Sequence, residues 1–117
     1  MAQILIVDDE PEIRDVYRRF LADEGYSVFE AADAVEAHET LVANHIDLVL
    51  LDIRMPDIDG VTMNEVIQFA HSRSKVIIAS VYPVNRQMEL IQEAADFFDK
   101  AQGPAVLLDM IRRVLAA

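Results

Sequence analysis

Acidic side chains that follow two separate apolar runs are the residues best placed to do chemistry in this sequence. The triplet Asp8-Asp9-Glu10 comes directly after residues 4–7, and Asp52 comes directly after residues 48–51. Carboxylates that are brought together in a partly buried site repel one another unless a cation joins them. Oxygen ligands in a chain without cysteine favour a hard cation, Mg²⁺ or Mn²⁺. The acidic residues therefore predict a divalent-cation site.

Ser80 and Lys100 add a hydroxyl group and a positive charge to this set. Ser80 follows the apolar residues 76–79, and Lys100, one of only two lysines, follows the aromatic pair at 97–98. A carboxylate that faces a divalent cation and an ammonium group can attack phosphorus and form an aspartyl phosphate. Phosphoryl transfer asks the protein mainly for positioning and charge compensation. These residues therefore predict phosphoryl chemistry, with the lysine and the serine contacting phosphoryl oxygens.

Five apolar segments must position these side chains. The segments at 4–7, 48–51 and 76–79 are continuous and apolar, which is typical of strands covered on both faces. The shorter segments around 28–29 and 97–98 are typical of edge strands. Alternation with helices predicts an α/β fold of the flavodoxin-like, doubly wound type, with a five-stranded parallel sheet in the order 2-1-3-4-5 and five helices. In that order, Asp8, Asp9 and Asp52 meet at the carboxyl edge of neighbouring strands.

Residues that start and stop helices delimit the five predicted helices. Proline suits a first helical turn, and glycine or asparagine suits the residue after a helix, whereas aspartate caps the helix N-terminus. The first helix is expected between Pro11 and Gly25, the second between Asp33 and Asn44, and the others at 61–70, at 85–95 and from Pro104 onward.

The composition bounds the class of protein. A length of 117 residues with 53% hydrophobic residues fits a single domain, residues 1–117, with a sizeable core. The net charge of −11 makes nucleic acid and anionic membranes poor partners of this domain. There is no cysteine, which excludes disulfides and thiolate chemistry. No apolar run is long enough to span a bilayer, and the first residues do not have the charged start of a signal peptide, so we expect a cytoplasmic protein.

The residues around the expected site form a specific pattern that extends over essentially the whole chain. Its parts are Asp8-Asp9 after the first strand, Asp52 followed by Met55-Pro56-Asp57 and Asp59-Gly60, Ser80 after the fourth strand, and Phe97 three residues before Lys100. This pattern resembles the receiver domain of two-component response regulators, which has the CheY-like form of the flavodoxin-like fold.

The resemblance implies which residues take part in phosphorylation and metal binding. Asp52 would accept a phosphoryl group from a phosphohistidine on a sensor histidine kinase or a histidine phosphotransfer protein. Asp9, Asp52 and the backbone carbonyl of Arg54 would bind Mg²⁺, or Mn²⁺ in its place, and Asp8 would assist. Gly60 suits the tight entry to the third helix, where a side chain would restrict the backbone. The expected function is that of a phosphoacceptor that promotes its own phosphotransfer and turns over no independent substrate.

The resemblance also implies a switch and an output surface. Lys100 would contact the phosphoryl group, Ser80 would move toward it, and the ring of Phe97 would turn inward behind Ser80. The face formed by the fourth helix, the fifth strand and the fifth helix is the expected output surface and a possible dimer interface. Arg14 and Arg18 share one face of the first helix, which is either a solvated face or part of a kinase-docking surface.

The chain departs from the usual family pattern in four places. One is Phe97, which lacks the hydroxyl of the common tyrosine, so that a switch at this residue reports packing and not a hydrogen bond. Ala101 stands where many members have a proline with a cis peptide bond, and because a cis bond before alanine costs about 3 kcal/mol, a trans bond is expected. Val81 stands where a small residue is usual, and its branched side chain would either narrow the access to Asp52 or hinder the shift of Ser80. Arg54 and Tyr82 occupy positions that modulate dephosphorylation in the family, and their bulk predicts slow self-dephosphorylation.

Three alternative functions remain open at this point. A degenerate receiver would act only as a protein-binding module. A small Mg²⁺-dependent phosphohydrolase with an aspartate nucleophile would need Asp-x-Asp after the first strand, and Asp8-Asp9-Glu10 does not have that spacing. A flavin binder would need a phosphate loop there, which the acidic triplet would repel. The chain is either a stand-alone regulator or the receiver of a longer one.

Overall fold

One parallel sheet forms the centre of the computed structural model, which describes residues 1–53, 60–91 and 93–117. Its strands lie in the order β2-β1-β3-β4-β5, so that the two shorter apolar segments are at the edges. The predicted fold and strand order are therefore confirmed. The strands are β1 (Gln3–Val7), β2 (Ser27–Ala31), β3 (Leu48–Leu51), β4 (Lys75–Ser80) and β5 (Asp96–Asp99).

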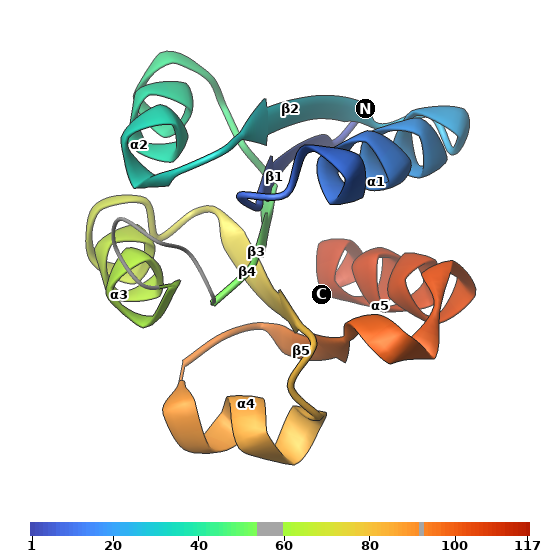
Figure 1. The fold of residues 1–117 in the computed structure, drawn as a ribbon. Helices are drawn as coiled ribbons and strands as arrows, with labels where there is room; N and C mark the ends of the chain where they lie inside the picture. The colour runs from blue at the N-terminus through green and yellow to red at the C-terminus, as the bar shows by residue number, and fades with distance from the viewer. Residues whose placement is uncertain (54–59, 92) are drawn as a thin grey trace.

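Helices cover both faces of the sheet (Figure 1). On one face lie α1 (Pro11–Asp23) and α5 (Pro104–Ala116). On the other face lie α2 (Ala34–Ala43) and α3 (Gly60–Ala70), with α4 (Val84–Leu90) beside the edge strand β5. This arrangement leaves the carboxyl edge of the sheet to the loops that follow each strand.

Alternate residues of the central strands supply two separate cores. Leu5, Val49 and Ile78 belong to the core beneath α2 and α3, whereas Ile4 and Leu50 belong to the core beneath α1 and α5. All residues of β3 are buried, as its continuous apolar sequence predicts. A sheet covered in this way gives the residues at its strand ends a rigid base.

Most helix ends follow their sequence signals. Pro11 opens α1, and Gly25 follows that helix with a positive φ of 91°. The Asp33 side chain caps α2 by accepting a hydrogen bond of 2.9 Å from the backbone N–H of Glu36. The described part of the chain contains no helix that is long and apolar enough to cross a membrane.

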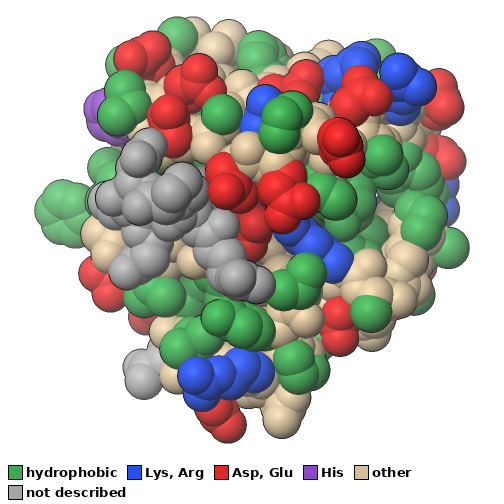
Figure 2. All heavy atoms as spheres, in the orientation of Figure 1, with side chains coloured by type: hydrophobic (Ala, Val, Ile, Leu, Met, Phe, Trp, Pro, Cys, Tyr) green, Lys and Arg blue, Asp and Glu red, His purple; other side chains and the backbone are tan. Residues whose placement is uncertain are grey.

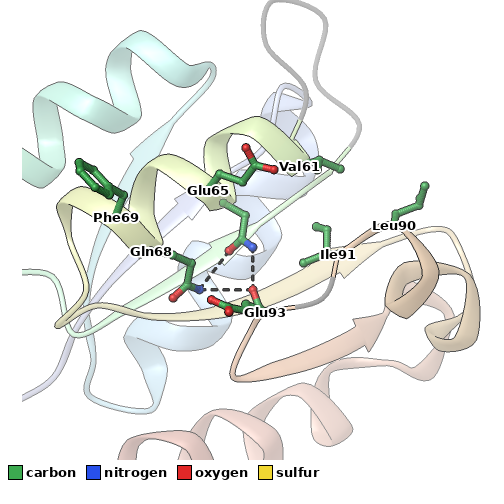
Figure 3. Close-up of a pocket in the computed structure, with 8 residues that line it drawn as sticks. Val61, Glu65, Gln68, Phe69, Leu90, Ile91 and Glu93 are labelled. Carbon is green, nitrogen blue, oxygen red and sulfur yellow. Dashed lines mark hydrogen bonds between the residues drawn. The ribbon is translucent and has the colours of Figure 1, made fainter.

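The predicted C-terminal half of the fourth helix is wrong. The sequence predicts a helix over residues 85–95, but α4 ends at Leu90 and Ile91 is extended and buried. The backbone carbonyl of Glu93 is instead bound from α3, by the Asn64 side-chain amide at 2.6 Å and by the Gln68 amide at 3.4 Å (Figure 3). These contacts tie the segment after α4 to α3.

Candidate functional site

Asp8 and Asp52 lie side by side at the carboxyl edge of the sheet. The strands β1 and β3 are neighbours, with Val7 paired to Leu51, and each aspartate is the next residue along its strand. The Asp52 N–H donates to the Val7 carbonyl at 3.0 Å, and the Asp8 N–H donates to the Ala31 carbonyl at 3.1 Å. Both side chains are buried, with 2% of Asp8 and 5% of Asp52 exposed. The ladder therefore fixes two carboxylates in one protected place.

Lys100 joins the two carboxylates. Its Nζ lies 2.7 Å from Oδ2 of Asp8 and 3.3 Å from Oδ2 of Asp52, and 11% of its side chain is exposed. Burial lowers the pKa of Lys100, but the hydrogen bond to Asp8 and the charges of both aspartates outweigh burial and raise this pKa above its ordinary value. Lys100 is therefore a stable ammonium group that offsets part of the negative charge.

A short 3₁₀ helix, Lys100–Gln102, presents the lysine to the site. The Asp99 carboxylate accepts a hydrogen bond of 2.9 Å from the Ala101 N–H, and the Gln102 side chain accepts one of 3.2 Å from the Asp99 N–H. No cis peptide bond occurs in the described residues, so the trans bond expected before Ala101 is confirmed. A local capping box thus holds the turn in which the family often has proline.

Asp9 and Glu10 extend the acidic group to the surface. Both side chains are exposed. One carboxylate oxygen from each of Asp8, Asp9 and Glu10 lies within 4.8 Å of those of the other two residues. Figure 2 shows a group of Asp and Glu side chains in the middle of this face, with a Lys or Arg side chain beside them. This set of oxygen donors, part buried and part open, fits Mg²⁺. The predicted ligand at the Arg54 carbonyl lies outside the described residues.

Ser80 and Phe97 lie on the two strands beyond β3. Ser80 ends β4, is fully buried and accepts a hydrogen bond of 3.2 Å from the Tyr82 N–H to its Oγ. Phe97 is half-buried in β5 and packs against the core beneath α2 and α3. Val81, by contrast, has 57% of its surface exposed.

Gly60 allows α3 to begin against the backbone of the nucleophile candidate. A Cβ at this position would lie 2.6 Å from the Asp52 carbonyl oxygen and would overlap Ile53. The Gly60 N–H also donates to the Ile53 carbonyl at 3.1 Å. A glycine is thus required at this helix entry because there is no space for a side chain. Its backbone does not require glycine, because the φ angle of Gly60 is not positive.

The comparisons with known proteins identify the family to which this arrangement belongs. The response regulator receiver domain matches residues 4–112. The chain is a member of the response regulator receiver domain family. It has the CheY-like fold of that family.

Two curated relatives illustrate the range of the family. The chain is 36% identical over 115 residues to the regulatory protein VanR of Enterococcus faecium, covering 97% of this chain and 48% of VanR. It is 33% identical over 94 residues to sporulation initiation phosphotransferase F of Bacillus subtilis, covering 80% of this chain and 73% of that protein. The receiver domain thus spans about half the length of the transcriptional regulators that it matches.

Solved structures agree with the fold. The response regulator TrrA of Thermotoga maritima, solved with Mg²⁺ and beryllium fluoride, is 31% identical with a TM-score of 0.89, covering 97% of this chain and 99% of that one. TrrA in complex with the histidine kinase ThkA is 30% identical with a TM-score of 0.86, covering 98% and 99%. A receiver domain protein of Methanospirillum hungatei is 30% identical with a TM-score of 0.92, covering 99% and 94%.

Two residues beside the site of this receiver domain have surroundings that the sequence does not reveal. Arg14 donates from Nη1 to the Asp8 carbonyl at 2.6 Å, its Nε lies 3.4 Å from Glu30, and 16% of its side chain is exposed. Burial raises the pKa of the Tyr17 hydroxyl, Lys100 opposes this rise, and the charge of Asp8 adds to it. The solvated-face interpretation of Arg14 is therefore wrong.

Proposed function

We propose that Asp52 is the phosphoacceptor of this receiver domain and that its phosphorylation switches partner binding. The observation that supports this most strongly is the pair of contacts from Lys100 to Asp8 and Asp52, at 2.7 Å and 3.3 Å, at the carboxyl edge of the sheet. Ligands of open α/β sheets bind at that edge. A buried carboxylate held next to an ammonium group is poised to receive a phosphoryl group, whose oxygens the ammonium can bind.

The transfer step requires little more than alignment and charge compensation. An oxygen of the Asp52 carboxylate attacks phosphorus, a P–O bond forms, and the P–N bond to the donor imidazole breaks. The imidazole keeps the electron pair of that bond and takes a proton from solvent. Lys100 then binds a phosphoryl oxygen, and the Ser80 hydroxyl donates to another.

The acidic residues around Asp52 would hold the metal ion. Asp8, Asp9, Asp52 and the Arg54 backbone carbonyl are the proposed ligands, of which the carbonyl lies outside the described residues. When it is bound, Mg²⁺ neutralises negative charge on the phosphoryl oxygens. Asp8 is hydrogen-bonded through Oδ1 to the Glu10 N–H at 3.0 Å, which keeps that carboxylate oriented.

Ser80 and Phe97 are the proposed switch residues. A Ser80 hydroxyl that rotates toward the phosphoryl group leaves the Tyr82 N–H, and Phe97 is half-buried and able to repack behind it. Phosphorylation then favours an arrangement that the unphosphorylated protein already samples. A coupling free energy of about 1 to 3 kcal/mol is typical for such a switch.

The proposed upstream partner is a sensor histidine kinase or a histidine phosphotransfer protein, because TrrA forms a complex with a histidine kinase. We further propose that residues 1–117 form one receiver domain, alone or within a longer regulator, that turns over no independent substrate. The net charge of −11 disfavours nucleic acid binding by this domain. We also propose a homodimer through α4, β5 and α5. On that face Arg86 pairs with Glu89 and Arg113 pairs with Asp109 within the chain.

Intact-mass analysis after incubation with acetyl phosphate and Mg²⁺ tests this function. We expect a phosphoryl adduct on the wild type that is missing from Asp52→Asn and lasts for minutes or longer after the donor is removed. The same amount of adduct on both proteins would refute the assignment of Asp52. A folded wild type with no adduct from acetyl phosphate or from a phosphorylated kinase would favour the binding-module alternative. Decay of the wild-type adduct within seconds would refute slow self-dephosphorylation.

A further inference from the structure

Gln87 is a fully buried polar side chain between two segments of the switch region. No part of it is exposed, and its Nε2 donates two hydrogen bonds of 2.8 Å, one to the Tyr82 carbonyl and one to the Phe98 carbonyl. A primary amide has two N–H donors, so both are in use. Its Oε1 is buried and accepts no hydrogen bond from the described residues. A polar group that is buried at this cost calls for a reason other than packing.

The two carbonyls that Gln87 binds belong to the segments that carry Ser80 and Lys100. Tyr82 is two residues after Ser80 and is tied to it through the 3.2 Å bond from its N–H to the serine Oγ. Phe98 is two residues before Lys100 and pairs with Ala79 in the ladder between β4 and β5. One amide nitrogen on α4 therefore bridges both segments.

We propose that Gln87 is a positioning residue that couples the Ser80 segment to the Lys100 segment, so that both side chains reach a phosphoryl group on Asp52 together. This inference rests on the proposed function of Asp52. When Ser80 rotates away from the Tyr82 N–H, a shift of the Tyr82 carbonyl displaces the Gln87 amide with it, because a lost bond would leave a buried donor of Gln87 without a partner. Gln87 also donates to the Phe98 carbonyl and is part of α4. A displacement of Gln87 therefore also moves the Phe98 segment and α4.

A double-mutant cycle tests this coupling. The rate constant of adduct formation from acetyl phosphate, at saturating Mg²⁺, is measured for the wild type, Gln87→Met, Ser80→Ala and the double variant. Methionine keeps the length of the side chain and removes the donors. We expect Gln87→Met to slow the reaction about tenfold, since small displacements of reacting groups have large effects on rate. If Gln87 acts through both segments, part of its effect is already lost in Ser80→Ala, so the slowing in the double variant is clearly smaller than the product of the two single effects. Independent, multiplying effects would overturn the proposal.

Gln68→Met is the matched control. Gln68 also donates from Nε2 to a backbone carbonyl, that of Glu93 at 3.4 Å, but it does so on α3 between elements that carry neither Ser80 nor Lys100 (Figure 3). We expect its adduct formation to match that of the wild type. Thermal unfolding of each variant separates a loss of stability from a loss of rate. If Gln87 were purely structural, Gln87→Met would lower the melting temperature, and its effect on the rate would not depend on Ser80→Ala.

A measurement on the unaltered protein covers the case in which Gln87→Met does not fold. The two side-chain N–H resonances of Gln87 are followed by NMR while Mg²⁺ and beryllium fluoride are added. We expect both resonances to shift in the wild type and to stay in place in Asp52→Asn. Resonances that do not move in a wild type that forms the phosphoryl adduct would overturn the role of Gln87 alone, whereas a wild type without adduct would overturn the function on which it rests.

Discussion

The Lys100 ammonium lies 2.7 Å from an Asp8 carboxylate oxygen, although 92 positions separate the two residues in the chain. The contact links the residue that follows the central strand β1 to the one that follows the edge strand β5. Asp52, which follows the neighbouring strand β3, lies 3.3 Å from the same ammonium group. The strand order thus brings the positive charge of Lys100 to the two negative charges of the site.

Lys100→Met should destabilise the folded protein. Removal of the ammonium group leaves the Asp8 and Asp52 carboxylates buried together without compensation, and breaking a buried ion pair from one side costs about 3 to 5 kcal/mol. We expect the low end of this range, about 3 kcal/mol, in urea unfolding at neutral pH. Lys75→Met is the control, because Lys75 is exposed at the start of β4 and its loss should change little. Equal stabilities of the two variants would contradict the importance of the contact.

The stability contributed by Lys100 should vanish at alkaline pH. The carboxylates outweigh burial and raise the pKa of Lys100 above 10.5, so the folded state binds this proton more tightly than the unfolded state does. The contribution is therefore complete below pH 10.5 and is lost as the pH rises through the pKa of the folded protein. Urea unfolding at increasing pH should show a steeper loss for the wild type than for Lys100→Met. Parallel curves for the two proteins would argue against the ion pairs.

Gly60→Ala should harm both folding and phosphorylation. The new Cβ would lie 2.6 Å from the Asp52 carbonyl oxygen, and overpacking of this kind costs about 1 to 3 kcal/mol. Gly25→Ala is an informative partner, since Gly25 has a positive φ and open space around its Cβ position. That variant should lose about 1 to 2 kcal/mol and keep the phosphorylation rate of the wild type. A normal rate of adduct formation in Gly60→Ala would show that the spacing at Asp52 is not critical.

Mg²⁺ should raise the melting temperature through Asp9. A ligand that binds only the folded state at about ten times its Kd adds about 1.4 kcal/mol of stability. Asp9→Asn removes a proposed ligand and one of the clustered negative charges, so its stability without Mg²⁺ should stay the same or rise while the Mg²⁺ effect shrinks. Asp23→Asn, an exposed change at the end of α1, serves as the control in calorimetry. A full Mg²⁺ effect in Asp9→Asn would exclude Asp9 as a ligand.

The strands are the most predictable part of the fold, because runs of consecutive apolar residues indicate which segments are buried. The run at 48–51 becomes β3 without a change of boundary. The end of α4 was not predictable, because Ile91 leaves the helix to enter the core and Glu93 takes its hydrogen bonds from α3. These are contacts between elements, and no local pattern of apolar residues reports them.

The site was predictable where strand order alone brings residues together. Asp8 and Asp52 follow paired strands, so their proximity follows from the topology. The contact of Arg14 with the Asp8 carbonyl and the bridging amide of Gln87 depend instead on side-chain orientation after packing. An arginine or a glutamine on a helix is most often solvated, and only the folded structure distinguishes these two.

The residue that carries the phosphoryl group can be identified chemically. The adduct formed with acetyl phosphate and Mg²⁺ is reduced with borohydride, which converts an aspartyl phosphate to homoserine, and the modified residue is located by tandem mass spectrometry. The assignment of Asp52 as phosphoacceptor predicts homoserine at position 52 in the wild type and in Asp9→Asn supplied with excess Mg²⁺. Modification at position 8 or 9 of the wild type, with position 52 unchanged, would contradict it.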